Sequence, residues 1–219
     1  MSTFKAVIFD LDGTLLNTLD ELASITNTVL EQNGFRAYPL DRYRYFVGDG
    51  AETMIQRAIG DVCPDPDVIK RCLAEFLEFY NANCGEGSRL YDGIKELLIE
   101  LVHRGLKLAV LSNKPHDLTL KNVSLFLSDI PFDRVLGQRE GVPKKPAPQA
   151  VNEIIDAFGI NAQDCLYLGD TSVDMKTAVS AGVFPVGVLW GFRDKEELLE
   201  HGAKKLIEHP LDLLLLLNK

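Results

Sequence analysis

Several short, mostly apolar runs are separated by helical patterns along the chain. The runs are Ala6 to Phe9, Lys107 to Leu111, Arg134 to Leu136, Cys165 to Leu168 and Phe184 to Leu189. Such runs are typical of strands buried on both faces, so they predict a parallel sheet covered by helices. The predicted fold class is α/β, a doubly wound parallel sheet of the Rossmann-like kind.

Two segments between these strands show helix signals at both ends. Asp92 can cap a helix that carries apolar residues from Ile94 to Val102, and Gly105 stands where a left-handed residue would end it. The segment from Pro148 to Phe158 repeats this pattern, with Gly159 at its end. The alternation of strands with helices supports the α/β interpretation.

The spacing of the first two predicted strands indicates an insertion. Residues 10–106 separate them, whereas a simple βαβ unit needs only roughly 30 residues. The pattern inside this interval is helical. We therefore predict that residues 17–85 form a separate helical cap domain, and that residues 1–16 and 86–219 form the α/β core.

Two helices of the predicted cap have recognisable starts. Thr18 and Glu21 have the spacing of a capping box, and Gly34 would end the helix that follows. Asp65 and Pro66 would start a later helix. Both segments place apolar residues at helical spacing, which predicts helices that bury one side.

Composition and charge narrow the possible partners. With 46% hydrophobic residues, a chain of 219 residues can bury a core. A formal net charge of −9 and the lack of an extended basic stretch argue against nucleic acid. Leu213 to Leu217 is far shorter than the roughly 20 apolar residues of a spanning helix, so we expect a C-terminal core helix and no membrane segment.

The cysteines and the start of the chain indicate a reducing compartment. The cysteines are Cys63, Cys72, Cys84 and Cys165. They form no Cys-x-x-Cys pair and have no histidine set nearby, so we expect buried, reduced thiols. An apolar strand follows Met1 almost directly, which leaves no room for a secretion signal. We therefore expect a cytoplasmic protein, either a monomer or a homodimer.

Acidic side chains follow two of the predicted strands. Asp10 and Asp12 follow the first strand, and Asp170 and Asp174 follow the fourth. Ligands of open α/β sheets bind beyond the carboxyl ends of the strands, so these acids should share one edge. Neighbouring buried carboxylates repel one another unless a cation lies between them. We predict Mg²⁺, which takes one or two carboxylates together with water and phosphate.

Polar and basic residues follow two further strands. Ser112 and Asn113 stand at the end of the second strand, and Lys144 and Lys145 lie in a proline-flanked loop. A hydroxyl donor and a fixed cation suit phosphate oxygens. Each feature alone is as typical of a cap, a turn or a solvated surface, whereas four of them at four strand ends favour one site.

With these residues in view, the chain resembles the haloacid dehalogenase-like hydrolase superfamily over essentially its whole length. The four motifs of that superfamily are matched by Asp10-Leu11-Asp12-Gly13-Thr14, by Ser112, by Lys145, and by Gly169-Asp170 with Asp174. The insertion at 17–85 resembles the helical cap of the superfamily. Asn17 departs from the pattern, because relatives often carry an acidic residue there.

The resemblance implies a magnesium-dependent phosphatase. Asp10 would attack phosphorus and form an aspartyl-phosphate, while Asp12 would act first as general acid and then as general base. The dehalogenases of the superfamily lack this second acid, so Asp12 favours phosphoryl chemistry. Mg²⁺ would be held by the carboxylates of Asp10 and Asp170 and by the backbone carbonyl of Asp12.

The resemblance also implies roles for the remaining side chains. Ser112, Asn113 and Lys145 would bind the phosphoryl oxygens. Lys145 is preferred to Lys144 because the lysine of the superfamily directly precedes a proline. The supporting residues would be Asp174 and Thr14.

The segment Phe46 to Ala51 resembles a cap loop of the phosphoglycolate phosphatases. Its residues Gly48, Asp49 and Gly50 form the expected specificity loop, because glycine lets the loop approach the site closely. We therefore expect a small phosphorylated metabolite as the partner, with 2-phosphoglycolate first. The carboxylate of such a substrate would need a cation or backbone donors nearby. The candidate cations are Arg42, Arg44 and Lys114.

Other functions remain open at this point. A broader small-metabolite phosphatase, a pyrophosphatase or a sugar-phosphate mutase would share the same core. A receiver-type signalling module also combines acids, a hydroxyl and a lysine on a doubly wound sheet. That module has its phosphoacceptor on a middle strand and lacks a large insertion, whereas the acids here follow the first strand.

Overall fold

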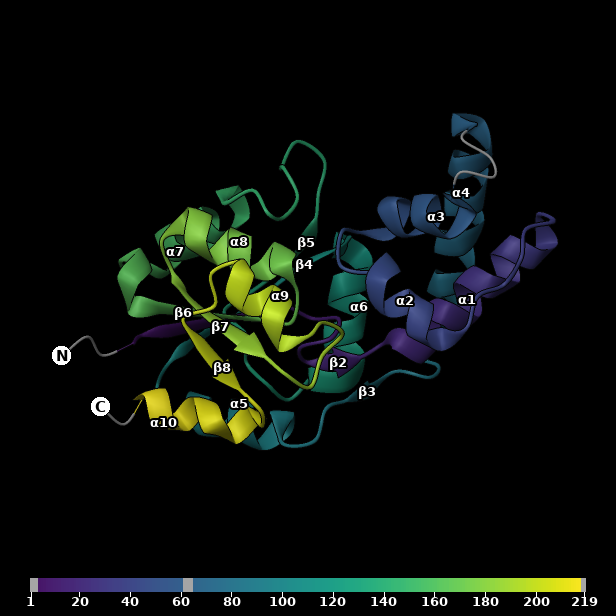
Figure 1. Cartoon of the computed structure of the whole chain (residues 1–219). Helices are drawn as coiled ribbons and strands as arrows, with labels where there is room; N and C mark the ends of the chain where they lie inside the picture. Colours follow the sequence, from purple (N-terminus) through teal and green to yellow (C-terminus); the bar gives the residue numbers. More distant parts are fainter. Residues whose placement is uncertain (1–3, 61–64, 218–219) are drawn as a thin grey trace.

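A six-stranded sheet forms the centre of the core in the computed structural model, which describes residues 4–60 and 65–217 (Figure 1). All its neighbouring strands run parallel, in the order β5-β4-β1-β6-β7-β8. The strands are β1 Ala6–Phe9, β4 Lys107–Pro115, β5 Arg134–Gln138, β6 Cys165–Gly169, β7 Phe184–Val188 and β8 Lys205–Ile207. This arrangement confirms the predicted doubly wound α/β fold.

Helices cover both faces of the sheet. Successive side chains of a strand point to opposite faces, so Val7 and Phe9 of β1 join one apolar cluster, and Ala6 and Ile8 join another. The first cluster includes side chains of α5, and the second includes side chains of α7. The helices of the core are α5 Ile94–His103, α6 His116–Leu127, α7 Gln149–Phe158, α8 Ser172–Ala181, α9 Lys195–Glu200 and α10 Leu214–Leu217.

The direction in which the chain adds strands reverses at β1. The chain places β4 and β5 on one side of β1, and then β6, β7 and β8 on the other. Ligands of open α/β sheets bind at such a switch point, outside the carboxyl ends of the strands. The loops that follow β1, β4 and β6 therefore meet at one edge of the sheet.

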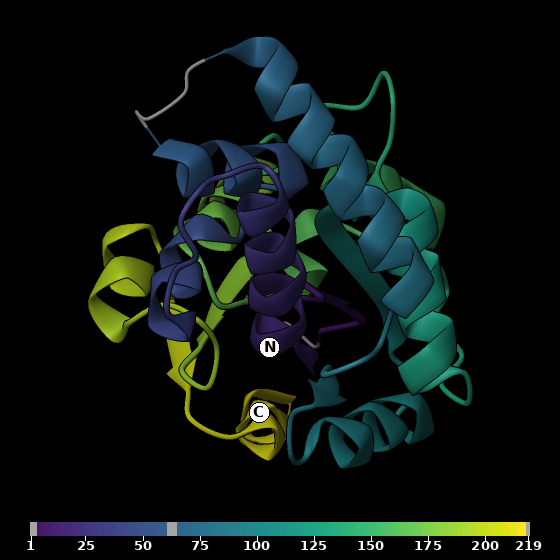
Figure 2. The ribbon, with the colours of Figure 1, turned by 90° about the vertical axis from the view of Figure 1, so that its right-hand side faces the viewer.

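Four helices between β2 and β3 pack together beside this edge (Figures 1 and 2). They are α1 Leu19–Gln32, α2 Leu40–Phe46, α3 Ala51–Ile59 and α4 Pro66–Asn83. β2 (Leu16–Asn17) and β3 (Arg89–Leu90) pair antiparallel where the chain leaves and re-enters the core. The helices share an apolar cluster that also takes in Leu118 and Phe192 of the core. The division at 17–85 stays a prediction, and the β2–β3 pair supports it.

The predicted helix-end signals at Gly105, Gly159 and Asp65 are found in the structure, whereas the one at Asp92 is not. Gly105 and Gly159 adopt left-handed conformations, with φ of 72° and 65°. The Asp65 side chain caps α4 by accepting a backbone N–H at 2.9 Å. Asp92 does not cap α5, because Gly93 occupies the N-cap with φ of 83° and places Asp92 one residue too early.

The strands and the C-terminal segment also depart from the predicted bounds. β4 extends beyond Leu111 to Pro115, through polar residues that are buried at the site. β8 has no predicted counterpart, because three residues beginning with a lysine give no apolar run. The predicted C-terminal helix shortens to α10, with Leu213 buried just before it. None of the helices in the described ranges is long and apolar enough to cross a membrane.

Of the cysteines that the structure describes, Cys72 and Cys165 are buried as expected, whereas Cys84 is half-buried. Burial raises the pKa of Cys165 to about 12, which keeps its thiol protonated near neutral pH. Cys63 lies outside the described residues.

The predicted capping box at the start of α1 is wrong. Thr18 is the N-cap residue, but its side chain makes no capping hydrogen bond. Glu21 turns away from it and accepts hydrogen bonds from the Gly85 N–H at 2.7 Å, from the Ser88 hydroxyl and from Tyr80 Oη at 3.4 Å. A carboxylate gains more from these partners across the cap connection than from one local N–H, so the tertiary contacts prevail.

Replacing Glu21 by alanine should therefore destabilise the protein. The change removes the acceptor of the half-buried donors Gly85 and Ser88 in the returning connection, which should lower the free energy of unfolding by about 1–3 kcal/mol. Urea unfolding measures this loss. Glu31→Ala, an exposed position on the same helix, should change it by no more than about 0.5 kcal/mol. Equal effects of the two variants would contradict this role of Glu21.

Candidate active site

Three buried carboxylates meet at the switch point of the sheet. Asp10 follows β1, Asp170 follows β6, and Asp174 lies in the first turn of α8. One oxygen from each of the three lies within 4.8 Å of the others. The fold therefore brings Asp10 and Asp170 together as predicted, although they lie 160 positions apart in the sequence.

A single lysine reaches two of these carboxylates. Lys145 Nζ lies 2.8 Å from Asp10 Oδ1 and 2.7 Å from Asp174 Oδ1, and only 3% of its side chain is exposed. Lys144 points elsewhere, and its Nζ donates to the Asp49 carbonyl at 2.9 Å and to Thr53 Oγ1 at 3.2 Å. The geometry thus places Lys145, and not Lys144, beside Asp10.

The third carboxylate, Asp170, is held in a tight backbone cradle. Its Oδ1 accepts from Thr14 Oγ1 at 3.1 Å, and its Oδ2 accepts from the Phe192 N–H at 2.9 Å. A Cβ on Gly13 would lie 2.2 Å from Asp170 Oδ2, and one on Gly191 would lie 2.2 Å from Asp170 Cβ. These glycines therefore leave the space that the carboxylate needs.

Asp174 holds its position through the start of α8. Its Oδ2 accepts from Thr171 Oγ1 at 2.7 Å and from the Thr171 N–H at 3.1 Å, which completes a capping box. Its Oδ1 faces Lys145. The helix start thus fixes a carboxylate that orients the lysine, which is consistent with the predicted supporting role of Asp174.

The charge of this cluster is not balanced by the side chains alone. Burial, and then the neighbouring Asp174, raise the pKa of Asp170 to about 7, and the same two causes raise the pKa of Asp10 well above its ordinary value. Burial alone would lower the pKa of Lys145, but Asp10 and Asp174 outweigh it and hold this pKa well above its ordinary value. The Lys145 ammonium thus contacts only two of the three buried carboxylates, and a small cation that prefers oxygen ligands fits this donor set.

A second ion pair lies beside the cluster. Lys114 Nζ lies 2.7 Å from Asp12 Oδ1 and donates to Tyr80 Oη of the cap at 2.7 Å. The ammonium also lies 4.7 Å from the centre of the Tyr80 ring. Burial alone would lower the pKa of Lys114, but Asp12 and Tyr80 raise it, so the lysine stays charged. This link between core and cap was not predicted.

The residues that end β4 divide into two roles. Ser112 lines the cavity described below, and its Oγ accepts from the Lys114 N–H at 3.1 Å. The Asn113 side chain accepts from the Lys145 N–H at 2.9 Å and donates to the Lys145 carbonyl at 3.1 Å and to the Gly48 carbonyl at 3.2 Å. Its amide therefore positions Lys145 and the cap loop, while its predicted contact with phosphate stays a prediction.

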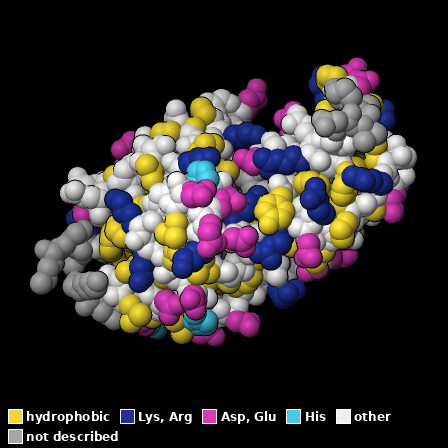
Figure 3. Space-filling view, viewed as in Figure 1, with side chains coloured by type: hydrophobic (Ala, Val, Ile, Leu, Met, Phe, Trp, Pro, Cys, Tyr) yellow, Lys and Arg dark blue, Asp and Glu magenta, His cyan; other side chains and the backbone are white. Residues whose placement is uncertain are grey.

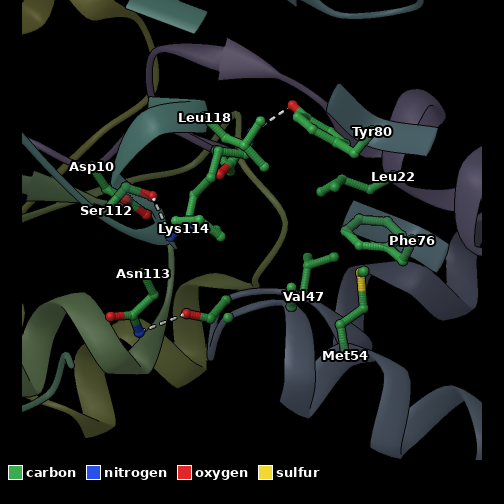
Figure 4. Close-up of a pocket in the computed structure, with 15 residues that line it drawn as sticks. Asp10, Leu22, Val47, Met54, Phe76, Tyr80, Ser112, Asn113, Lys114 and Leu118 are labelled. Carbon is green, nitrogen blue, oxygen red and sulfur yellow. Dashed lines mark hydrogen bonds and ion pairs between the residues drawn. The ribbon is translucent and has the colours of Figure 1, made fainter. Parts of the chain in front are cut away.

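A cavity between core and cap opens onto these residues (Figure 4). Its empty volume is about 540 Å³, part of it open to solvent. The lining residues are Asp10, Asp12, Leu22, Val47, Gly48, Gly50, Ala51, Met54, Phe76, Tyr80, Ser112, Asn113, Lys114, Pro115 and Leu118. The cap side is largely apolar, and the core side carries the charged groups.

The predicted specificity loop lies only partly in this cavity. Gly48 and Gly50 line it, with positive φ of 111° and 92°. A Cβ on Gly50 would lie 3.2 Å from the Asn113 carbonyl, so glycine permits the close approach. Asp49 instead pairs with Arg57 at 2.6 Å. The structure thus places the glycines, but not the Asp49 side chain, at the site.

Acidic and basic side chains are interspersed on the face shown in Figure 3. No broad basic area is visible there, in agreement with the net charge of −9. A nucleic-acid partner would instead require clustered Lys and Arg along its phosphates. This face therefore offers no support for nucleic-acid binding.

The comparison with known families agrees with this geometry. The family described as haloacid dehalogenase-like hydrolase matches residues 7–188. The chain belongs to this family. This membership confirms the resemblance predicted from the four motifs, and it argues against the receiver-type alternative.

Relatives of this haloacid dehalogenase-like hydrolase cover nearly its whole length. A phosphoglycolate phosphatase of Xanthomonas campestris is 30% identical, over 95% of this chain and 94% of the relative. An N-acetylmuramic acid 6-phosphate phosphatase of Pseudomonas aeruginosa is 32% identical, over 98% and 95%. The solved structure of a "predicted phosphoglycolate phosphatase" of Haemophilus somnus has a TM-score of 0.91 and 30% identity, over 99% of each chain. The predicted enzyme class, a hydrolase of the phosphatase type, is confirmed.

Divalent metal should stabilise this hydrolase more strongly as pH rises. A carboxyl group whose pKa is raised by folding favours the protonated form, so the metal-free protein should lose stability as pH rises from 3.8 to about 7, the ordinary and folded values of Asp170. Mg²⁺ binds the ionised carboxylates, so its stabilising effect should grow over the same range. Thermal unfolding at pH 6 and pH 8, with and without Mg²⁺, measures both trends.

The matched variants for this measurement are Asp170→Asn and Asp156→Asn. The first should abolish the Mg²⁺ effect, whereas the second, at an exposed position, should retain it. A stabilisation by Mg²⁺ that is equal at both pH values, or that survives in Asp170→Asn, would contradict a metal site at this cluster.

Proposed function

We propose that this hydrolase is a magnesium-dependent phosphomonoesterase that forms an aspartyl-phosphate on Asp10. Our first candidate substrate is 2-phosphoglycolate. The observation that carries the proposal is the buried group of Asp10, Asp170 and Asp174 around Lys145, with a further carboxylate, Asp12, beside it. A nucleophile, an acid and a charge-balancing group are the parts that phosphoryl transfer through a covalent intermediate needs.

The Asp10 carboxylate is fixed on one of its oxygens. Oδ1 accepts from the Leu11 N–H at 2.7 Å and lies 2.8 Å from Lys145 Nζ. We therefore assign the attack to Oδ2. As the new bond between Oδ2 and phosphorus forms, the bond between phosphorus and the ester oxygen breaks.

Asp12 would supply and then recover one proton. It would protonate the departing ester oxygen, which leaves as an alcohol. It would then take a proton from the water that attacks phosphorus, so that phosphate leaves and the Asp10 carboxylate is restored. The contact of 2.7 Å with Lys114 holds the Asp12 side chain at the edge of the cavity.

The phosphoryl oxygens would be bound by the hydroxyl of Ser112 and the ammonium of Lys145. Both groups are almost fully buried, so their interactions with developing charge are weakly screened. Asn113 would contribute by fixing the backbone of Lys145.

Mg²⁺ would be held by the carboxylates of Asp10 and Asp170, together with the backbone carbonyl of Asp12. Bound there, it would neutralise the carboxylates and polarise a phosphoryl oxygen. The excess of acidic groups over Lys145, and the Thr14 hydroxyl that orients Asp170, support this donor set. Removing the ion with a chelator should abolish turnover.

The substrate proposal rests on the cap loop and on the relatives. Gly48 and Gly50, which carry the resemblance to phosphoglycolate phosphatases, line the cavity. A larger substrate is a second candidate, because one relative is an N-acetylmuramic acid 6-phosphate phosphatase and the cavity is partly open to solvent. Both compounds are phosphate esters that carry a carboxylate.

We further propose that residues 17–85 act as a cap that excludes bulk water during turnover. Reciprocal contacts join the two parts. Arg44 Nε of α2 donates to the Phe192 carbonyl at 2.9 Å, and Arg193 Nη2 donates to the Val47 carbonyl at 2.9 Å. These bonds support a closed arrangement over the site.

Asp10→Asn should reduce phosphate release from 2-phosphoglycolate by more than about a thousandfold, because an amide is a poor nucleophile. The protein should keep its fold, since the change removes a buried charge. Phosphate release with Mg²⁺, together with thermal unfolding, tests both statements. Asp156→Asn serves as the control and should retain parent activity. Activity of Asp10→Asn near the parent level would remove Asp10 from this role.

Asp12→Asn should lower turnover of alkyl phosphates by about a hundredfold or more, because the leaving alkoxide then lacks its proton donor. Formation of the phosphoenzyme from p-nitrophenyl phosphate, whose leaving group needs little protonation, should fall much less. Rapid-quench measurement of the nitrophenol burst separates this step from later hydrolysis. Equal losses for both substrates in the first step would contradict a general acid at Asp12.

A further inference from the structure

Lys114 is the one cation among the described residues that line the cavity between core and cap. It lies in β4, and only 6% of its side chain is exposed. A lysine is rarely buried to this extent without a specific partner. Its partners in the structure are Asp12 of the core and Tyr80 of the cap, and both of them line the cavity.

The contact between Lys114 and Asp12 limits how far the Lys114 ammonium can lie from the ester oxygen of a bound substrate. In the proposed reaction Asp12 donates a hydrogen bond to the ester oxygen, and Lys114 Nζ lies 2.7 Å from Asp12 Oδ1. The ammonium therefore lies within roughly two hydrogen-bond lengths plus the width of the carboxyl group, about 8 Å, of that oxygen. A carboxylate on the carbon next to the ester oxygen falls within this distance.

The Lys114 ammonium has one N–H donor left for a substrate carboxylate. Lysine has three N–H donors. In the described part of the chain, Asp12 Oδ1 takes one and Tyr80 Oη takes another. The third can bind a ligand in the cavity. The Tyr80 hydroxyl and ring also hold the ammonium in place, which limits the entropy lost when a ligand binds.

The other two candidate cations, Arg42 and Arg44, make different contacts. The Arg42 guanidinium lies 5.9 Å from the centre of the Phe46 ring, and Arg44 donates to the carbonyls of Phe192 and Gly191. Neither arginine lines the cavity. The cap side of the cavity, with side chains such as Phe76 and Val47, offers apolar surface and cannot neutralise an anion (Figure 4).

We propose that Lys114, positioned by Tyr80, is the specificity-determining residue that binds a carboxylate one carbon away from the ester oxygen of the substrate. This inference rests on the proposed phosphatase function and narrows its substrate class. Substrates of that class are phosphate esters of 2-hydroxy acids. The apolar side of the cavity would contact the hydrocarbon part of longer members of the class.

The test compares two substrates that differ in the carboxylate. 2-Phosphoglycolate carries it, and ethyl phosphate has a methyl group at the same position. The ratio of their kcat/KM values does not depend on the concentration of active enzyme, so partial misfolding of a variant cannot alter it. The parent should prefer 2-phosphoglycolate, and Lys114→Met should lower this ratio by about a hundredfold or more.

A matched control is available on α6. Lys121 Nζ donates to the Asn81 carbonyl of α4 at 2.6 Å, so Lys121 also joins core to cap, but it is only half-buried and does not line the cavity. Lys121→Met should leave the ratio unchanged. Lys114→Gln, which keeps hydrogen-bond donors without the charge, should change the ratio in the same direction as Lys114→Met.

Each remaining outcome overturns a defined part of the account. If Lys114→Met loses activity equally on both substrates, Lys114 acts only through Asp12, and the carboxylate subsite is wrong. If the parent hydrolyses both substrates without preference, the subsite is also wrong, while the phosphatase proposal stands. If the parent releases phosphate from neither substrate with Mg²⁺, the proposed function fails and this inference fails with it.

Discussion

Mutual repulsion among three buried carboxylates governs the arrangement of the site. One oxygen each of Asp10, Asp170 and Asp174 lies within 4.8 Å of the others, and these buried carboxylates are screened only weakly by water. Lys145 offsets part of this charge, while burial, and then the neighbouring Asp174, still raise the pKa values of Asp10 and Asp170. The glycines around Asp170 and the capping box around Asp174 hold the groups together despite this repulsion. In the proposed function, a divalent cation would offset the remaining negative charge of this cluster, and the phosphoryl group of the substrate would bind beside it.

The cap contributes a second electrostatic connection. Lys114 and Tyr80 join Asp12 to a helix of the cap, while Arg44 and Arg193 exchange hydrogen bonds with backbone carbonyls across the boundary. The cavity consequently has a charged core side and a largely apolar cap side. In the proposed function, the core would perform the phosphoryl chemistry, and the apolar side of the cap would contact the hydrocarbon part of the leaving group.

The sequence was sufficient to predict those residues of the site that directly follow a strand. Asp10 stands at the end of an apolar run, and the rules for open sheets place Asp170 at the same edge. Tyr80 could not be assigned, because its helical spacing is equally typical of a core residue and its contact with Lys114 depends on how the cap docks. The spacing of Glu21 predicted a capping box, but partners 64 and 67 positions away outcompeted the local N–H.

The central claim is that the Asp10 and Asp170 carboxylates share one divalent ion beside the phosphoryl site. Crystals soaked in Mn²⁺, which replaces Mg²⁺ and scatters anomalously, would locate the ion directly. The account predicts one anomalous peak in contact with an oxygen of each carboxylate and with the backbone carbonyl of Asp12. A peak that contacts only one of the two carboxylates, or an ion bound elsewhere with none at this cluster, would contradict it.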